Sequence, residues 1–275
     1  MDTSSAVLET VRHALKSAGI NEPDAKARVI LSHAMNTGLG DVLLPLPVDS
    51  AQRAYIDAMA QRCAQGEPVE YVTGKAYFRY LELDVTPDVL IPRQETELVV
   101  EEAISLINAL GYKRVLDIGT GSGCIAISLA TETKACVDAC DISPAALMAA
   151  AGNAHRNHAD VRFFISDMLG GVTGTYDLIV SNPPYVSDEE YIALDAGVRD
   201  FEPKLALTAG DGLDYYRIIA CEAGRFINPN GALVLEIGMT QAADVVAILV
   251  DNDFFDIGTK KDYSGRDRIV TAHKK

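Results

Sequence analysis

The stretch Val115-Leu116-Asp117-Ile118-Gly119-Thr120-Gly121-Ser122-Gly123 decides the fold of this chain. Its first half is an apolar, strand-like run, and its second half is a Gly-x-Gly-x-Gly turn that opens a helix. Glycine is needed in such a turn because a Cβ would block both the tight bend and the close approach of a ligand to the backbone. The stretch therefore predicts a nucleotide-type site at the end of a buried strand.

Strand-like and helical patterns alternate from this turn onward. The strand-like runs are 114–118, 135–142, 161–165, 177–181 and 232–237, and the helical segments are 123–130, 144–157, 213–226 and 241–251. Such alternation forms right-handed βαβ crossovers, so we predict an α/β fold with a mostly parallel sheet covered on both faces. The last two runs, 255–259 and 268–272, are joined by a short turn and should pair as an antiparallel hairpin.

Three short amphipathic helical patterns precede the α/β region and carry no cluster of catalytic residue types. Gly19 ends the first, Asn21 can cap the second, and Asp49 can cap a third that closes at Gly66. The period then changes to that of a half-buried strand, which predicts a β-hairpin. We expect a helical domain over 1–70 with a binding role, a hairpin linker over 71–90 and an α/β domain over 91–275.

The composition is acidic and favours a globular protein. Lys and Arg number 24 against 39 Asp and Glu, a net charge of −15 that repels a phosphate backbone, so no direct nucleic-acid binding is expected. The five cysteines form no Cys-x-x-Cys pair, which predicts free thiols and no metal site. A signal-peptide pattern and a long apolar span are both missing from the sequence, so we expect a cytoplasmic protein away from the membrane.

An acidic residue, Asp141, ends the strand after the glycine turn, where its carboxylate can take both hydroxyls of an adenosine ribose. The third glycine comes one residue earlier than in the dinucleotide fingerprint, and no basic cluster is present to meet a pyrophosphate. An adenosine cofactor without phosphate fits better, and S-adenosylmethionine is the commonest of these. Its expected cradle is Gly119, Thr120, Gly121, Ser122 and Gly123. Asp167, after the third strand, could accept the adenine amino group or cap a turn.

The fourth strand runs into Asn182-Pro183-Pro184-Tyr185, over the same cleft. Two prolines remove two backbone donors and fix the backbone, so the loop is a rigid acceptor. The side-chain carbonyl of Asn182 and the backbone carbonyl of Pro183 suit the two hydrogens of one planar NH₂ group, and Tyr185 offers a flat face. Holding an amide nitrogen toward a sulfonium methyl is a positioning problem that needs no strong base. We predict Asn182, Pro183 and Tyr185 as catalytic residues, with Asn182 also at the cofactor.

These residues and several others make the chain resemble the peptide chain release factor glutamine methyltransferases, the PrmC or HemK family, over nearly its full length. The resemblance rests on Gly66-Glu67-Pro68, Thr73-Gly74, Ile91-Pro92-Arg93-Gln94-Glu95-Thr96-Glu97, the glycine turn, Asn182-Pro183-Pro184-Tyr185, Phe201-Glu202-Pro203, Ala206-Leu207, Gly210-Asp211-Gly212-Leu213 and Gly265-Arg266-Asp267-Arg268. It implies a class I, Rossmann-like, seven-stranded methyltransferase domain.

The resemblance also implies the reaction: methyl transfer from S-adenosyl-L-methionine to N5 of the glutamine in the Gly-Gly-Gln loop of release factors, a step of translation termination. The cofactor would contact the glycine turn and Asp141, the loop from Asn182 to Tyr185 would hold the glutamine, and the helical domain would help to bind the release factor. Met168 stands where several relatives carry an aromatic residue beside the adenine, so a repacked pocket is expected.

Two other activities share the planar NH₂ chemistry. An N6-adenine nucleic-acid methyltransferase would use the same kind of loop, but the acidic charge and the lack of a recognition domain argue against it. A methyltransferase for glutamine in a ribosomal protein would also share the loop, and the Ile91–Glu97 segment favours the release-factor branch. Arg93, Glu97 and Glu236 receive no role from the sequence.

Overall fold

The computed structural model describes residues 2–274, which form two compact units. One unit contains residues 2–75 together with Asp195–Phe201, and the other contains residues 76–194 and 202–274. The smaller unit has one hydrophobic core, and the larger has two. The inclusion of Asp195–Phe201 in the first unit was not predicted, because nothing in the local pattern of that segment distinguishes it.

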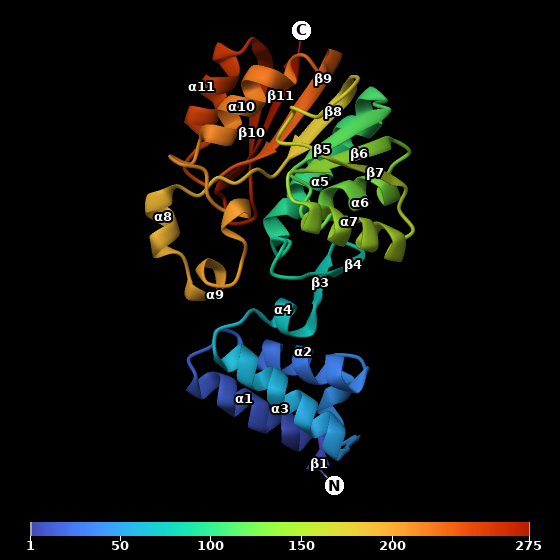
Figure 1. Cartoon of the computed structure of the whole chain (residues 1–275), viewed down its shortest axis with the longest axis vertical. Helices are drawn as coiled ribbons and strands as arrows, with labels where there is room; N and C mark the ends of the chain where they lie inside the picture. The colour runs from blue at the N-terminus through green and yellow to red at the C-terminus, as the bar shows by residue number, and fades with distance from the viewer. Residues whose placement is uncertain (1, 275) are drawn as a thin grey trace. The chain divides into compact units, whose positions relative to one another are not determined.

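The smaller unit is helical, as predicted. Its elements are β1 (Asp2–Thr3), α1 (Ser4–Ser17), α2 (Pro23–Met35), the 3₁₀ helix η1 (Asp41–Leu43), β2 (Pro47–Val48), α3 (Ser50–Ala64), α4 (Val69–Thr73) and α9 (Ala196–Arg199). The three long helices α1, α2 and α3 lie side by side (Figure 1). They bury apolar side chains in one core, among them Val11, Ile30 and Ile56. Burial of these amphipathic faces, more than helix propensity, stabilises helices of this length.

The helix starts show one confirmed and one wrong prediction. Asp49 caps α3 in a capping box: its side chain accepts from the N–H of Gln52 at 2.8 Å, and the Gln52 side chain accepts from the N–H of Asp49 at 3.1 Å. Asn21 does not cap α2. The cap residue is Glu22, with φ 53° and no side-chain cap bond within the described chain, because Pro23 begins the helix and fixes its first turn.

The predicted hairpin is shorter than expected at its start. Residues Val69–Thr73 form helix α4, which ends at Gly74 with φ 69°. Strands β3 (Lys75–Phe78) and β4 (Leu81–Asp84) then form a two-stranded sheet. Leu81 and Leu83 are buried while the residues between and after them are partly exposed, which is the alternation that predicted the strand.

The larger unit is built on one seven-stranded sheet, which confirms the predicted α/β fold class. Its strands are β5 (Arg114–Ile118), β6 (Cys136–Asp141), β7 (Val161–Ile165), β8 (Tyr176–Ser181), β9 (Ile227–Glu236), β10 (Phe254–Lys261) and β11 (Asp267–Lys274). They lie in the order β7-β6-β5-β8-β9-β11-β10. Every pair from β7 to β9 is parallel.

The last two strands pair antiparallel, as predicted, but the sequence did not predict their order in the sheet. β11 lies between β9 and β10 and is antiparallel to both. β10 therefore runs in the same direction as β9, one strand position away from it. The short turn after β10 allows only an antiparallel return, and the vacant position between β9 and β10 receives it.

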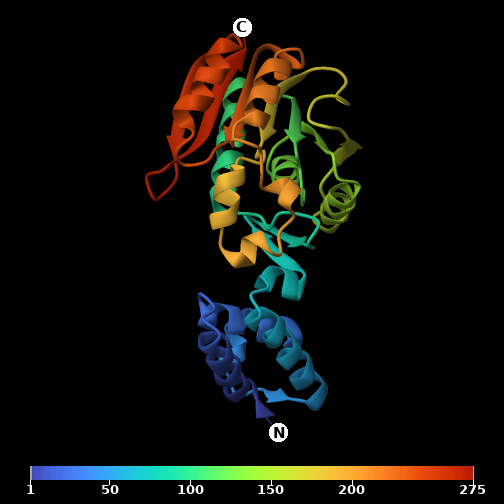
Figure 2. The same ribbon diagram turned by 60° about the vertical axis from the view of Figure 1, so that its left-hand side comes forward.

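Helices cover both faces of this sheet (Figure 1, Figure 2). They are α5 (Gln94–Leu110), α6 (Cys124–Glu132), α7 (Pro144–Arg156), α10 (Asp214–Ala223) and α11 (Ala242–Asp251), with α8 (Asp188–Ala193) and the 3₁₀ helix η2 (Lys204–Ala206) in the connection before α10. Val115 packs into a core with α5 and α6, whereas Leu116 packs into a second core with α10 and α11. Successive strand residues thus reach opposite faces, so both faces of the sheet are buried. Within residues 2–274, no helix combines the length and apolar character that a membrane crossing needs.

The chain order of the strands reverses at β5, which places a crevice at one edge of the sheet. From β5 the chain goes to β6 and β7 on one side, and it returns to β8 and β9 on the other. The hydroxyl of Ser181, at the end of β8, donates to the carbonyl of Ile118, at the end of β5, at 2.8 Å. Ligands of open α/β sheets bind outside the carboxyl ends of the strands at such a switch point.

Candidate active site

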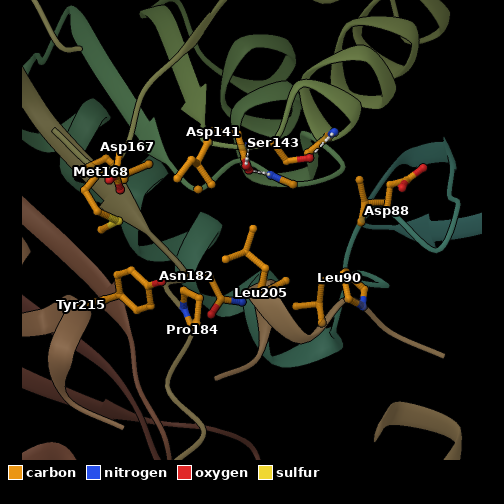
Figure 3. A pocket seen from close by; sticks show the side chains of 18 of the residues that line it. Asp88, Leu90, Asp141, Ser143, Asp167, Met168, Asn182, Pro184, Leu205 and Tyr215 are labelled. Atoms are coloured by element: carbon orange, nitrogen blue, oxygen red, sulfur yellow. Dashed lines mark hydrogen bonds between the residues drawn. The ribbon is translucent and has the colours of Figure 1, made fainter. Parts of the chain in front are cut away.

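A pocket of about 260 Å³ lies in the larger unit beyond these strand ends. Its walls include the turn after β5, the ends of β6 and β7, the loop after β8, and residues of two later segments. Figure 3 shows Asp141 and Asn182 on facing sides of this pocket, with Met168 toward one end and Asp88 toward the other. The glycine turn and the Asn182 loop line one cavity, although Gly119 and Asn182 are 63 positions apart in the sequence.

The glycine turn exposes its backbone to the pocket at two positions. Gly119 and Gly121 both line the pocket, with φ of 70° and 55°, and a Cβ at either would meet no protein atom within 4 Å. The N–H groups of Gly119 and Thr120 donate to the carbonyl of Cys140 at 2.9 and 3.0 Å, which ties the turn to β6. A backbone with positive φ and with free space where a Cβ would stand lets a ligand approach closely.

The other three residues of the turn lie behind the pocket wall. Thr120 and Ser122 are buried, and the Thr120 hydroxyl donates to Asp117 at 2.7 Å. At Gly123 a Cβ would stand 2.9 Å from Cδ1 of Ile127 and 3.1 Å from Cβ of Ala150. These residues shape the turn and the start of α6. Their contact with the cofactor stays a prediction.

Asp141 lines the pocket and is held by two backbone donors. Its carboxylate accepts from the N–H of Gly121 at 2.9 Å through one oxygen and from the N–H of Ser143 at 2.9 Å through the other. Each oxygen has a second lone pair, so the carboxylate can still accept two hydroxyl donors. Asp141 is therefore fixed in place with acceptor capacity left for a ribose.

Asp167 and Met168 follow β7 and line the same pocket. Met168 has φ 45°, and its carbonyl accepts from the hydroxyl of Ser166 at 2.7 Å. Its thioether lies at the end of the pocket next to Tyr215, as Figure 3 shows. A flexible, polarisable Met at this place can fill the space beside a planar ring.

The Asn182-Pro183-Pro184-Tyr185 loop divides between the pocket and the core. Asn182 and Pro184 line the pocket, whereas Pro183 is buried and Tyr185 packs against the core beneath α10 and α11. The carbonyl of Tyr185 accepts from the side chain of Gln241 at 2.9 Å. Burial raises the pKa of Tyr185 to about 12, so its hydroxyl keeps its proton at neutral pH. Tyr185 is not among the residues that line the pocket, and a stacking role for it stays a prediction.

The structure gives partners to the three residues that received no role from the sequence. Arg93 forms a salt bridge of 2.5 Å with Glu202, whose side chain is 1% exposed. Glu97 accepts from the backbone N–H of Arg79 at 2.9 Å. Glu236, at the end of β9, accepts from the hydroxyl of Thr96 at 2.6 Å, and burial raises the pKa of Glu236 to about 7. Arg93 and Glu97 therefore fix local structure, and Glu236 lies next to the loop of Asn182.

Several pocket residues were missed by the sequence analysis. Pro87, Asp88, Val89 and Leu90, which follow β4, form one wall, and Leu205 of η2 and Tyr215 of α10 form part of another. Only the tertiary fold brings them to the strand ends. The Ile91-Pro92-Arg93 segment that follows Leu90 carried part of the family resemblance, but it did not indicate which neighbouring side chains face the cavity.

The charges of the pocket fit S-adenosyl-L-methionine and disfavour a pyrophosphate. Asp88, Asp141 and Asp167 line it, and none of its described lining residues is Lys or Arg. A cofactor with a cationic sulfonium and no phosphate matches this lining, because a pyrophosphate among carboxylates would be repelled. Together with the open backbone at the glycine turn, the residues present fit this cofactor.

Comparison with known proteins adds to this geometry. Residues 94–199 match the methyltransferase small domain family, and residues 6–74 match the PrmC N-terminal domain family. The chain is 39% identical to the release factor glutamine methyltransferase of Agrobacterium fabrum, covering 99% of this chain and 98% of that protein. It is 38% identical to that of Geobacter sulfurreducens, covering 98% and 95%.

Among solved structures, the fold is similar to a methyltransferase from Pyrococcus furiosus, with a TM-score of 0.55, 20% identity, and coverage of 82% of this chain and 99% of that one. This likeness supports the fold alone. The sequence relatives extend over both units and both motif regions. The chain therefore belongs to the release factor glutamine methyltransferase family.

Proposed function

We propose that this protein transfers a methyl group from S-adenosyl-L-methionine to the N5 side-chain amide nitrogen of the glutamine in the Gly-Gly-Gln loop of peptide chain release factors. The observation that carries the proposal is the position of Asn182. It lines the same cavity as Gly121 and Asp141, so an amide held by Asn182 lies beside the place where the cofactor would bind. The near full-length relatives support the choice of substrate.

The proposed cofactor contacts come from four segments of the larger unit. They are Gly119, Thr120, Gly121, Ser122 and Gly123 of the turn, Asp141, the pair Asp167 and Met168, and Asn182. Asp141 would hold the ribose hydroxyls through its remaining lone pairs, and Asp167 would accept from the adenine amino group. When bound, the cofactor supplies a methyl group on a positively charged sulfur.

The proposed chemical step depends on holding an amide in one orientation. The side-chain carbonyl of Asn182 and the backbone carbonyl of Pro183 would accept the two hydrogens of the glutamine NH₂ group. With both hydrogens held in the plane, the nitrogen lone pair faces out of it, toward the methyl group. The methyl–sulfur bond would break as the nitrogen–methyl bond forms, which leaves a neutral thioether. The methylated nitrogen would then release one of its protons to solvent, so no strong base is needed at the site. Pro184 and Tyr185 would complete the substrate contact.

We also propose that the chain has three functional segments. Residues 1–70 form the helical substrate-recognition domain, 71–90 the linker and 91–275 the methyltransferase domain. The helical domain has its own core, and none of residues 2–70 lines the pocket at the strand ends, which suits a role in binding the release factor. The net charge of −15 supports the expectation of no direct nucleic-acid binding. All five cysteines are free, which supports a reducing cytoplasm as the location.

The test is methyl transfer from labelled S-adenosyl-L-methionine to a purified release factor. A matched release factor with its Gly-Gly-Gln glutamine replaced serves as the control, and it should remain unlabelled. Ribosomal protein and adenine-containing DNA and RNA are offered in parallel reactions. Equal labelling of the two release factors, or stronger labelling of ribosomal protein or nucleic acid, would overturn the proposal.

A further inference from the structure

Three side chains form a continuous hydrogen-bonded line behind the pocket. The Nδ2 group of Asn182 donates to Oγ1 of Thr96 at 3.2 Å, and the hydroxyl of Thr96 donates to Oε2 of Glu236 at 2.6 Å. Thr96 is 2% exposed and Glu236 is 1% exposed. The line joins three elements: the loop after β8, the first turn of α5 and the end of β9.

The two orientations of an Asn amide fill almost the same space, so packing alone cannot select one of them. Hydrogen bonding can. An ionised Glu236 only accepts, and it therefore takes the single proton of the Thr96 hydroxyl. The Thr96 oxygen is left as an acceptor, and only the NH₂ end of Asn182 can satisfy it.

The free end of the Asn182 amide is then its carbonyl oxygen. Oδ1 accepts no hydrogen bond from residues 2–274, and Asn182 lines the pocket. A flipped amide would instead offer NH₂ toward an incoming NH₂ group. Two donors facing each other would not satisfy one another, which weakens the complex.

Glu236 also lies close to the far end of the same loop. The hydroxyl of Tyr185 is 3.5 Å from Oε1 of Glu236, on the carboxylate oxygen that Thr96 does not use. Between Asn182 and Tyr185 stand two prolines, whose backbone is already restricted. One buried carboxylate thus contacts both ends of the acceptor loop, directly at Tyr185 and through Thr96 at Asn182.

We propose that Thr96 and Glu236 are positioning residues that set the orientation of the Asn182 amide, so that it presents its carbonyl oxygen to the substrate glutamine. The inference rests on the proposed function and adds two residues to it. Neither residue touches the substrate. Both act through Asn182 by deciding which end of its amide is free.

The test compares Thr96→Val, which removes the hydroxyl at nearly constant volume, with Thr96→Ser, which keeps it. Single-turnover methylation of a release factor is measured for each, together with cofactor affinity by calorimetry and thermal unfolding. We expect Thr96→Val to lower the rate about tenfold to a hundredfold with cofactor affinity kept, and Thr96→Ser to restore the rate to within about threefold of wild type. Equal rates for Thr96→Val and wild type would overturn the inference.

A matched control is available in the same unit. Thr271 is 9% exposed and its hydroxyl donates to Glu102, itself 8% exposed, at 3.4 Å, away from the pocket. Thr271→Val should change thermal stability and leave the single-turnover rate unchanged. A fall in rate equal to that of Thr96→Val would show that loss of a buried hydroxyl lowers activity by destabilisation alone, against the inference.

A double-mutant cycle separates positioning from an independent role. If Thr96 acts only through Asn182, adding Thr96→Val to Asn182→Ala should cause no further loss of rate. The same loss in both backgrounds would overturn the inference while leaving the proposed function intact. A wild-type protein that leaves the release factor unmethylated would overturn the proposed function, and the inference with it.

Discussion

The carboxylate of Asp141, at the end of β6, accepts a hydrogen bond of 2.9 Å from the backbone N–H of Gly121, in the turn that follows β5. Its other oxygen accepts from the N–H of Ser143. Two loops from neighbouring strands are thereby joined through a single side chain that also lines the pocket. Asp141 has to keep both backbone bonds and still accept from a ligand.

Asp141→Asn should weaken cofactor binding by about tenfold to a hundredfold, because an amide has one acceptor oxygen where the carboxylate has two. Isothermal titration with S-adenosyl-L-methionine measures the change. Asp88→Asn removes one charge from the same pocket without touching the glycine turn, and we expect an effect below about threefold. Equal losses for the two variants would mean that only the pocket charge matters.

Asn182→Ala should lower the rate of methyl transfer about a hundredfold or more and leave cofactor affinity within about threefold of wild type. The variant removes the acceptor proposed for the substrate amide while the glycine turn and Asp141 remain. Single-turnover kinetics and calorimetry measure the two quantities separately. Loss of cofactor binding with an unchanged rate at saturating cofactor would assign Asn182 to the cofactor alone.

The single-turnover rate should rise with pH through about 7, because burial raises the pKa of Glu236 to about 7 and only the ionised form directs the Thr96 proton away from Asn182. The groups that face Glu236 electrostatically are Glu95, Arg268, Tyr185, Tyr216 and Cys124. Glu236→Gln, which does not titrate, should remove this rise. A pH profile identical to that of wild type would contradict the assignment.

The ionisation of Glu236 should also change the free energy of unfolding. The rate is expected to rise with pH, whereas the stability of the folded protein is expected to fall. The folded pKa of Glu236, about 7, lies above its ordinary value of 4.5, so its stabilising contribution is complete below pH 4.5 and is lost as pH rises to about 7. Each unit of pKa shift corresponds to about 1.4 kcal/mol. Burial also raises the pKa of Asp117 to about 7, so Asp117 contributes to the pH dependence of stability in the same range. Because Asp117 is present in both wild type and Glu236→Gln, the difference in stability between these two proteins reports the contribution of Glu236. Thermal unfolding at pH 5 and pH 8 measures it.

Gly123→Ala should destabilise the protein by about 2 kcal/mol or more, because the new Cβ would stand 2.9 Å from Ile127 at a φ of 84°. Gly152→Ala is the matched control. A Cβ there meets nothing within 4 Å, and the residue lies within α7, so a gain of about 0.5 to 1 kcal/mol is expected. Urea unfolding measures both. A neutral Gly123→Ala would show that the turn can shift away from the core.

Arg93→Met should lower the free energy of unfolding by about 2 kcal/mol, since it removes the guanidinium that pairs with the Glu202 carboxylate, whose side chain is 1% exposed. The control is Arg217→Met, which breaks a pair with Asp211 in which both side chains are about half exposed, and a much smaller change in the free energy of unfolding is expected because solvent screens the pair. A loss in cofactor affinity for Arg93→Met at unchanged stability would instead place Arg93 in the site.

The sequence determined the features that depend on local pattern. The period of apolar residues placed strands β5 and β7 and helices α6, α7, α10 and α11 to within a few residues, because each must bury one face or both. Turn chemistry identified the glycine turn and the Asp49 cap, since few residues can adopt those conformations. Asp141 and Asn182 followed from the rule that strand ends in a parallel sheet meet at one edge.

The tertiary structure decided what depends on contacts between distant segments. Examples are the insertion of β11 between β9 and β10, the pocket walls formed by Leu90 and Leu205, and the hydrogen-bonded line from Asn182 to Glu236. In each case the local sequence pattern of one segment does not indicate which distant segment it contacts. The Asn21 cap failed for a local reason, because Pro23 fixed the start of α2. Sequence patterns report which face of an element is buried, whereas a hydrogen bond between side chains 86 residues apart forms only when packing brings them together.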